Sequence, residues 1–155
     1  GRDQSLVNEI RTALINVCDD MVQYAQSNPY RRPLGDSYYW GCNGGVARQT
    51  LMLQVANMIS PSQEYVDTAL DAINHVFGRN VYCRSYVTGL GYNPPMYPHD
   101  RRSGADGITD PWPGYLVGGG HSETGWTDIQ DSYQTNEVAI NWNSALIYAL
   151  AGFLQ

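Results

Sequence analysis

The segment GGVARQTLMLQVANMI, residues 44–59, carries apolar side chains on most faces of a helix. A helix that is hydrophobic nearly all round is buried, because each of its faces has to be covered by another element. The sequence therefore predicts a deeply buried helix at 44–59. The apolar side chains are Val46, Ala47, Leu51, Leu53, Val55, Met58 and Ile59.

Two further helices are predicted on either side of this segment. Residues 3–26 form one, which ends before Asn28-Pro29 because a residue preceding proline disfavours helical geometry. Residues 62–77 form the other, after the start signal SPSQ at 60–63 and before Gly78. In that signal, Ser60 is the expected cap, Pro61 lies in the first turn and Gln63 completes a capping box. The apolar stripe of 3–26 consists of Leu6, Ile10, Leu14, Val17, Met21 and Ala25.

A fourth helix is predicted over residues 137–154, at the end of the stretch DSYQTNEVAINWNSALIYALAG, residues 131–152. Asn136 is the expected cap, and Glu137 would then lie in the first turn, where the helix dipole favours a charged carboxylate. Glu137 is either a charge of the cap region or a carboxyl that takes part in chemistry. The apolar face consists of Val138, Trp142, Ala145, Ala149 and Phe153.

Between Gly78 and Asn136 the sequence shows neither helical period nor sustained alternation. A structureless stretch of this length inside a compact domain indicates a functional loop system or a chain that is not self-contained. Two segments of it are rich in chemically active residues. SYVTGLGYNPPMYPHDR, residues 85–101, ends in His99 and Arg101, on a loop stiffened by prolines. WTDIQDSYQTNE, residues 126–137, contains Asp128 and Asp131 ahead of Glu137; taken alone, such residues are more often structural or solvated than catalytic.

Composition excludes several classes of function. The 155 residues suffice for one domain, the net charge is −6, and all nine basic residues are arginine, a balance that argues against nucleic-acid binding. No apolar run approaches the roughly 20 residues of a membrane span. No signal-peptide pattern occurs at the start, so either the chain is cytosolic or its leader lies outside it.

Cys18, Cys42 and Cys83 are widely spaced and are expected to be buried free thiols. The twelve tyrosines and four tryptophans are a weak indication of sugar binding, since aromatic rings pack against sugar faces.

The two loop segments resemble the two active-site signatures of family 9 glycoside hydrolases, which are cellulases with an (α/α)6 barrel. Similarity extends to YYWGCNGG at 38–45, HVFGRN at 75–80 and PWPGYLVGGG at 111–120, so it covers most of the chain. The first signature is matched by Ser85, Val87, Thr88, Gly91, Asn93, Pro98, His99 and Arg101, and the second by Trp126, Asp128, Tyr133, Glu137, Ala139, Asn143 and Ser144.

This resemblance implies an all-α fold that is part of an (α/α)6 barrel with long cleft-forming loops. It implies hydrolysis of β-1,4-glucosidic bonds in cellulose or related β-glucans with inversion, and no cofactor for the chemistry. Glu137 corresponds to the general acid, and Asp128 and His99 to the other two active-site residues. The residues implied in substrate binding are Arg101, Tyr133, Trp126 and Tyr92.

Three departures from the family pattern matter. Asp100 stands where many relatives have a second histidine, and INWN at 140–143 replaces Ile-Asp-Tyr-Asn. The Asp-Ala-Gly-Asp segment that carries the family's base is absent, so residues 1–155 resemble the C-terminal portion of the catalytic domain, whose partner would be the N-terminal part. Two alternatives to a hydrolase remain open, namely a sugar-binding module without catalysis and a structural fragment that needs a partner chain to fold.

Two further expectations come with the family. The protein is expected to be secreted, because polymeric cellulose cannot enter a cell. Calcium is common in relatives, although no EF-hand spacing occurs here. The acidic loop residues that offer oxygen ligands are Asp106, Asp110, Glu123 and Asp131.

Overall fold

The computed structural model describes residues 3–154, and its regular structure is helical. Within this range no strand forms, and three isolated β-bridges connect the loops. The predicted all-α class is confirmed. The helices are α1 (Gln4–Ser27), α2 (Cys42–Ile59), α3 (Gln63–Phe77), α4 (Arg101–Ala105), α5 (Tyr133–Asn136) and α6 (Ile140–Ala151).

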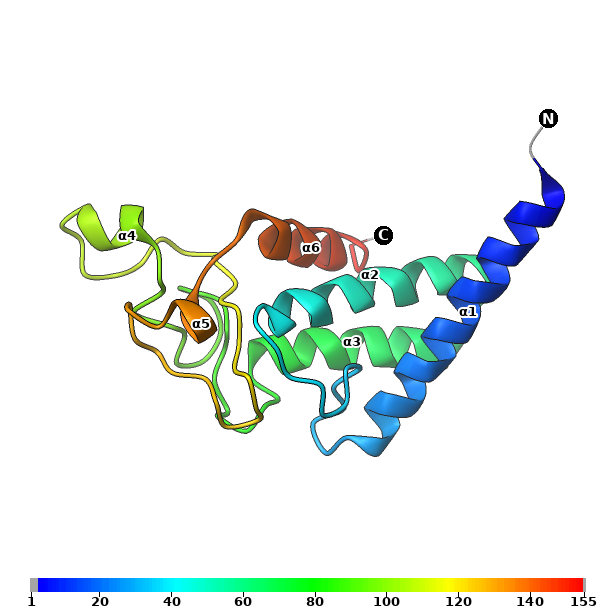
Figure 1. Ribbon diagram of the computed structural model, residues 1–155, viewed down its shortest axis with the longest axis horizontal. Helices are drawn as coiled ribbons and strands as arrows, with labels where there is room; N and C mark the ends of the chain where they lie inside the picture. Colours follow the sequence, from blue (N-terminus) through cyan, green and yellow to red (C-terminus); the bar gives the residue numbers. More distant parts are fainter. Residues whose placement is uncertain (1–2, 155) are drawn as a thin grey trace.

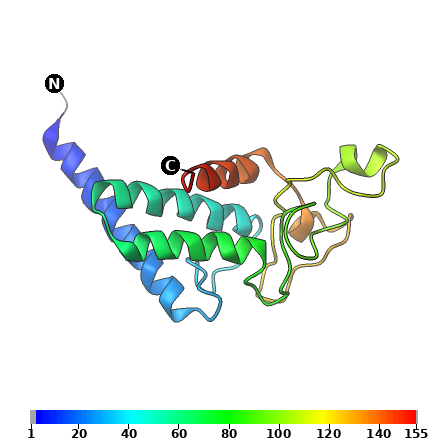
Figure 2. The same cartoon turned by 180° about the vertical axis from the view of Figure 1, so that it is seen from behind.

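Helix α2 is the centre of the helical part, since it packs against α1, α3 and α6. Figure 1 shows α2 and α3 side by side, with α6 along α2 and α1 crossing their far ends, and Figure 2 shows the same layer from behind. Buried side chains form two clusters. One surrounds Val46 and Trp142 near the loops, and the other surrounds Cys18 and Leu53 near α1.

The predicted burial of 44–59 is correct for only part of the helix. Residues from Cys42 to Ala47 are buried, and so are Thr50, Leu53 and Ala56. In the second half of α2, however, the side chains of Val55, Met58 and Ile59 are exposed, with 82% of Met58 accessible. No element among residues 3–154 covers this apolar surface.

The ends of the first three helices follow the predicted signals, with one correction. Asp3 caps α1, because its Oδ1 accepts hydrogen bonds from the backbone N–H groups of Ser5 and Leu6. Gly78 ends α3 with φ of 143°, a backbone conformation that favours glycine. The capping box expected at Ser60 is wrong, because α3 begins after Ser62, whose side chain makes no capping bond.

The prediction of a helix from residue 137 is also wrong. The short helix α5 ends at Asn136, and Glu137 is extended, with φ −68° and ψ 152°, before α6 begins. Its backbone is held by other segments: His99 and Glu137 form a parallel bridge, and the N–H of Gly118 donates to the carbonyl of Glu137 at 2.9 Å. These bonds between segments replace the helical bonds that the periodicity suggested. Asn136 is therefore not the cap of α6.

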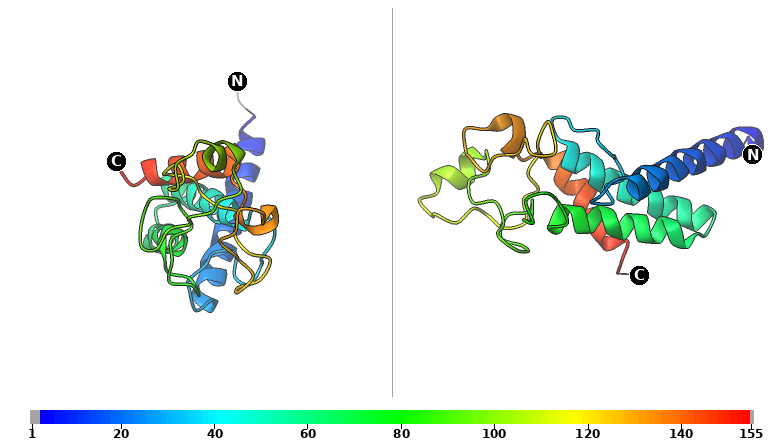
Figure 3. Two further views of the ribbon diagram at one scale, coloured as in Figure 1. Left: turned by 90° about the vertical axis from the view of Figure 1, so that its left-hand side faces the viewer. Right: turned by 90° about the horizontal axis from the view of Figure 1, so that it is seen from below.

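The long loops lie at one end of the helical layer, as Figures 1 and 3 show. They have a core of their own, which includes Tyr86, Val87, Leu116 and Trp126 and is continuous with the helical cluster. The loops are thus packed, and they contain α4 and α5, which the sequence pattern does not predict.

The loop between α1 and α2 is organised around a buried arginine. Arg32 is fully buried; its Nη1 donates to the carbonyls of Gly35 and Ser37, both at 2.8 Å, and its guanidinium lies over the ring of Tyr38. Burial, together with this neighbouring guanidinium, lowers the pKa of His75 to about 3, so the histidine is neutral beside Arg32. Of the two buried side chains, only Arg32 therefore carries a charge.

The structure can be compared with two expectations from composition, the burial of the cysteines and the absence of a membrane span. Cys18 and Cys42 are buried free thiols as expected, and burial raises the pKa of Cys18 to about 11. The same expectation is wrong for Cys83, which is exposed. Among the described helices, none has both the length and the apolar composition to cross a membrane.

Candidate active site

Glu137 and His99 are brought together by backbone pairing between segments far apart in the sequence. The N–H of His99 donates to the carbonyl of Asn136 at 2.8 Å, and His99 and Glu137 form a parallel bridge. Both side chains are partly exposed. Because Glu137 does not lie in the first turn of a helix, the dipole effect expected there does not apply to its carboxyl.

The imidazole of His99 is oriented by one backbone carbonyl. Its Nδ1 lies 2.6 Å from the oxygen of Gln130, and a carbonyl oxygen only accepts, so Nδ1–H donates this bond. The second ring nitrogen, Nε2, is left for another partner. The ring of Tyr133 stands edge-on to His99, with 6.3 Å between the centroids, and is 56% exposed.

Asp128 lies beneath the site and connects its loops. Its carboxylate pairs with Arg84 Nη2 at 3.0 Å and accepts hydrogen bonds from the backbone N–H groups of Met96 and Tyr97, at 2.9 and 3.0 Å. A fourth bond comes from Asn136 Nδ2 at 3.2 Å. With its oxygens occupied in this way, Asp128 holds the loop that leads to His99.

Trp126 differs from what the sequence suggests. Only 4% of the side chain is exposed, and its ring packs edge-on against Tyr82 and Tyr86. Its Nε1 donates to Oδ1 of Asn136 at 3.0 Å. The expected contact between Trp126 and substrate is corrected accordingly, since this ring packs below the site and has no open face for a sugar.

Two further predicted binding residues, Arg101 and Tyr92, are exposed. Arg101 begins α4, and its side chain forms no hydrogen bond or ion pair within residues 3–154. Tyr92 is 76% exposed. No hydrogen bond or ring contact in the described part of the chain joins Tyr92 to Glu137, His99 or Tyr133.

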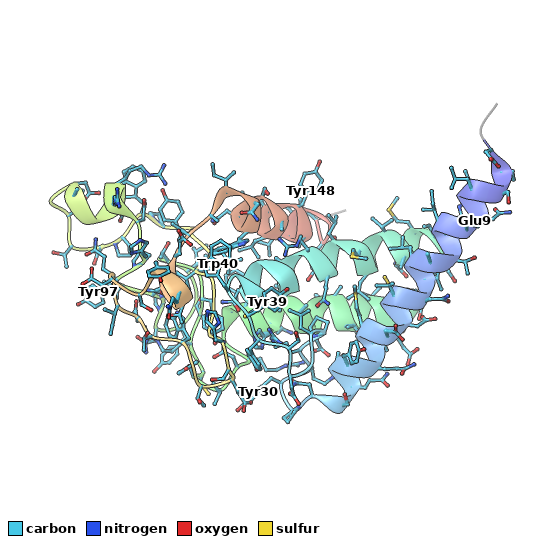
Figure 4. All side chains as sticks on the ribbon, in the orientation of Figure 1. Glu9, Tyr30, Tyr39, Trp40, Tyr97 and Tyr148 are labelled. Atoms are coloured by element: carbon cyan, nitrogen blue, oxygen red, sulfur yellow. The ribbon has the colours of Figure 1, made fainter. Side chains whose placement is uncertain are left out.

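Sequence reasoning missed two residues of the site. Asn136 is fully buried, accepts from Trp126, and donates to Asp128 and to the carbonyl of Tyr97, the latter at 2.6 Å. Trp40 Nε1 donates to Oε2 of Glu137 at 3.1 Å. Figure 4 shows Trp40 where the helices meet the loops, with Tyr97 farther out. The segment YYWGCNGG at 38–45 was the only signal for Trp40, and nothing in it indicates the partner.

The calcium site expected from the family stays a prediction. No three histidine, cysteine, aspartate or glutamate side chains in residues 3–154 come close enough together to hold a metal ion. Asp106, one of the acids considered, instead accepts hydrogen bonds from the indole of Trp112 at 2.6 Å and from the N–H of Ile108 at 2.9 Å.

A helical layer whose loops present a carboxyl, a histidine, an arginine and exposed aromatic rings has the groups that bind and cleave sugars. Residues 3–150 match the family model described as Glycosyl hydrolase family 9. The chain therefore belongs to glycosyl hydrolase family 9, and its helices are part of an (α/α)6 barrel.

Similar proteins cover the whole chain. It is 66% identical to Endoglucanase D of Acetivibrio thermocellus over 100% of its length, and 34% identical to the xyloglucan-specific endo-beta-1,4-glucanase BoGH9A of Bacteroides ovatus over 99%. It spans 25% and 29% of these two relatives. Among solved structures, a Bacteroides ovatus GH9 protein matches with a TM-score of 0.91 at 34% identity, covering 98% of this chain and 30% of that one. AaCel9A in complex with cellobiose-like isofagomine matches with a TM-score of 0.92 at 29% identity, covering 98% and 32%.

Proposed function

We propose that this chain is the C-terminal portion of a family 9 catalytic domain that hydrolyses β-1,4-glucosidic bonds in cellulose or a related β-glucan with inversion. Glu137 is the general acid that protonates the leaving oxygen. The observation that carries the proposal is the partly exposed carboxyl of Glu137, whose backbone is held beside His99 while its side chain stays accessible. The names of the relatives, an endoglucanase and a xyloglucan-specific endo-glucanase, support this substrate class.

The second carboxyl of the reaction lies outside this chain. Inverting hydrolysis needs a base on the far side of the bond, about 6.5–9.5 Å from the acid, to activate water. The base is an aspartate of the N-terminal part of the domain, which is the partner of this chain. Arg101 and Tyr133 bind the sugar next to the scissile bond. The domain is secreted, because its substrate is an insoluble polymer.

The test uses a complete catalytic domain. In a chimera, residues 1–155 replace the matching segment of Endoglucanase D, to which they are 66% identical. Proton NMR should show the α-anomer as the earliest product of a cellooligosaccharide. Initial appearance of the β-anomer would contradict the inverting mechanism.

A glucan-binding protein without catalysis is the second candidate, favoured by the exposed rings of Trp40 (52%) and Tyr133 (56%). The same chimera distinguishes the two. If it melts cooperatively and binds glucan but releases no reducing sugar, the catalytic proposal is wrong.

A further inference from the structure

The carboxylate of Glu137 has a single polar partner within residues 3–154, the indole of Trp40. The bond runs from Nε1 to Oε2 at 3.1 Å and joins residues 97 positions apart. Trp40 is one of the side chains labelled in Figure 4, at the junction of α2 with the loops. This contact is independent of the backbone pairing that brings His99 to Glu137.

The ring of Trp40 is held from one side. Trp142, which is 3% exposed, stands edge-on to it with 5.2 Å between the centroids and 74° between the planes. Trp142 itself fits only because residues 41 and 44 are glycine, since a Cβ at either position would overlap the indole. The side chain of Trp40 is 52% exposed.

The backbones that carry the two partners are also connected. Gly118 donates its N–H to the carbonyl of Glu137 at 2.9 Å and accepts at its own carbonyl from the N–H of Asn43 at 3.0 Å. Asn43 lies in the first turn of α2, just after Trp40. One residue therefore ties the acid's segment to the tryptophan's segment, so the distance between the two side chains is set by the fold.

An indole N–H donates and cannot accept. The oxygen that it contacts, Oε2, is therefore the acceptor, and because a carbonyl oxygen accepts better than a carboxylic hydroxyl, this bond favours the protonated acid that carries its proton on Oε1. After proton transfer, the same N–H binds a full carboxylate, and hydrogen bonds to charged groups are stronger than neutral ones.

We propose that Trp40 is a positioning residue for the general acid, which keeps the transferable proton of Glu137 on Oε1 and stabilises the carboxylate that remains. The inference rests on the proposed function. In the reaction the Oε1–H bond breaks, the proton joins the glycosidic oxygen, and that oxygen keeps the electron pair of the cleaved bond to the anomeric carbon. The oxygen of the attacking water forms the new bond to the anomeric carbon, and the water gives a proton to the aspartate base of the N-terminal part.

The test is Trp40→Phe in the chimera with Endoglucanase D. Phenylalanine keeps an aromatic ring against Trp142 but lacks the N–H. For unactivated glucan, kcat should fall by about 10–100-fold, the range for a hydrogen bond to a charged group, with KM nearly unchanged. The alkaline limb of the pH–rate profile should move to higher pH, because the ionised acid has lost its donor.

Trp112→Phe is the matched control, because it removes another exposed indole whose N–H binds a different carboxylate, that of Asp106. It should leave kcat and the alkaline limb unchanged. If Trp40→Phe behaves like this control, the inference is overturned. If Trp40→Phe does not fold, benzothienylalanine at position 40 replaces it, since sulfur takes the place of the N–H in a ring of nearly the same shape.

A spectroscopic measurement separates failure of this inference from failure of the proposed function. In the chimera with nitrogen-15-labelled indoles, the Trp40 N–H resonance should shift on Glu137→Gln, whether or not the chimera is active. An inactive chimera with this shift contradicts the proposed function but keeps the contact. Absence of the shift in an active chimera overturns the role of Trp40 alone.

Discussion

Two neighbouring residues, Asn136 and Glu137, have opposite environments, and this contrast makes the site. Asn136 is fully buried and bonded on both ends of its amide, to Trp126 and to Asp128. Asn136 is the last residue of α5, and Glu137 is the first extended residue after it, so the backbone changes direction between the two side chains. The amide of Asn136 is anchored in the interior, while the Glu137 carboxyl stays accessible.

At the scale of the residue, we expect Glu137→Gln to lower the hydrolysis rates of two substrates by different amounts. In the chimera, hydrolysis of unactivated glucan should fall by about 10²–10⁴-fold, the usual loss for a general acid. An aryl glycoside with a good leaving group needs little protonation and should keep far more of its rate. Initial rates on both substrates check this, with the melting temperature as the control for folding. Equal losses on both would mean that Glu137 is not the acid, and Asp128 would become the candidate.

At the scale of the elements, the loops carry the candidate site, and buried polar groups hold these loops together. The Asp128 carboxylate joins Arg84 to the backbone at Met96 and Tyr97, just before His99. Only 12% of the Asp128 side chain is exposed, so water screens these bonds weakly. The loop that presents His99 is thus ordered by the largely buried charge of Asp128.

Asp128→Asn should therefore loosen one loop. The substitution removes the negative charge that pairs with Arg84. It also replaces one carboxylate oxygen by an N–H₂ group, which cannot accept the hydrogen bonds that the backbone N–H groups of Met96 and Tyr97 donate to the carboxylate. In the chimera, the free energy of unfolding should fall by about 1.5–3 kcal/mol, as for hydrogen bonds to a charged group. Amide hydrogen exchange at Met96 and Tyr97 should accelerate.

Asp131→Asn is the matched control for this element, because Asp131 is exposed and its carboxylate has no hydrogen bond within the described residues. Urea denaturation should place it within about 0.5 kcal/mol of the wild type. If Asp128→Asn is equally mild, and exchange at Met96 and Tyr97 is unchanged, Asp128 does not hold the loop.

On the scale of the whole molecule, large apolar surfaces have no cover within residues 3–154. Leu6 and Ile10 on α1 are 53% and 59% exposed, and Ile140 and Ile147 on α6 are 91% and 66% exposed. Figure 3 shows α1 reaching beyond the other helices. A hollow of about 440 Å³ lies between α2, α3 and the end of α6, and Glu137 is not among its lining residues. Exposed apolar surface of this kind marks a partner surface or a risk of aggregation, and in an (α/α)6 barrel the other helices would cover it.

The isolated chain should consequently be helical but poorly cooperative. We expect far-ultraviolet circular dichroism of a helical protein without a sharp melting transition, and little glucanase activity. Adding the N-terminal segment of Endoglucanase D in trans should restore both the transition and the activity. A monomeric preparation of these 155 residues that melts cooperatively and cleaves cellulose by itself would contradict this reading.

Helix positions could be read from the sequence because their cause is local. The 3.6-residue period, proline after α1 and glycine after α3 act within a few residues, so α1, α2 and α3 end close to the predicted residues. Periodicity failed at residues 137–139, where bonds to His99, Val117 and Gly118 compete with the helix, and a window of local sequence does not contain those partners.

For the site, the resemblance to the family's signatures named Glu137, Asp128, His99, Arg101 and Tyr133, because residue types in a fixed order can be recognised without coordinates, and their roles stay predictions. Only the tertiary structure decided which of these face outward. It buried Trp126 with Asn136, placed Asp128 under the loops, and brought Trp40 to Glu137. These arrangements depend on contacts between residues up to 97 positions apart, and such contacts follow from how helices and loops pack together, which no local pattern of side chains specifies.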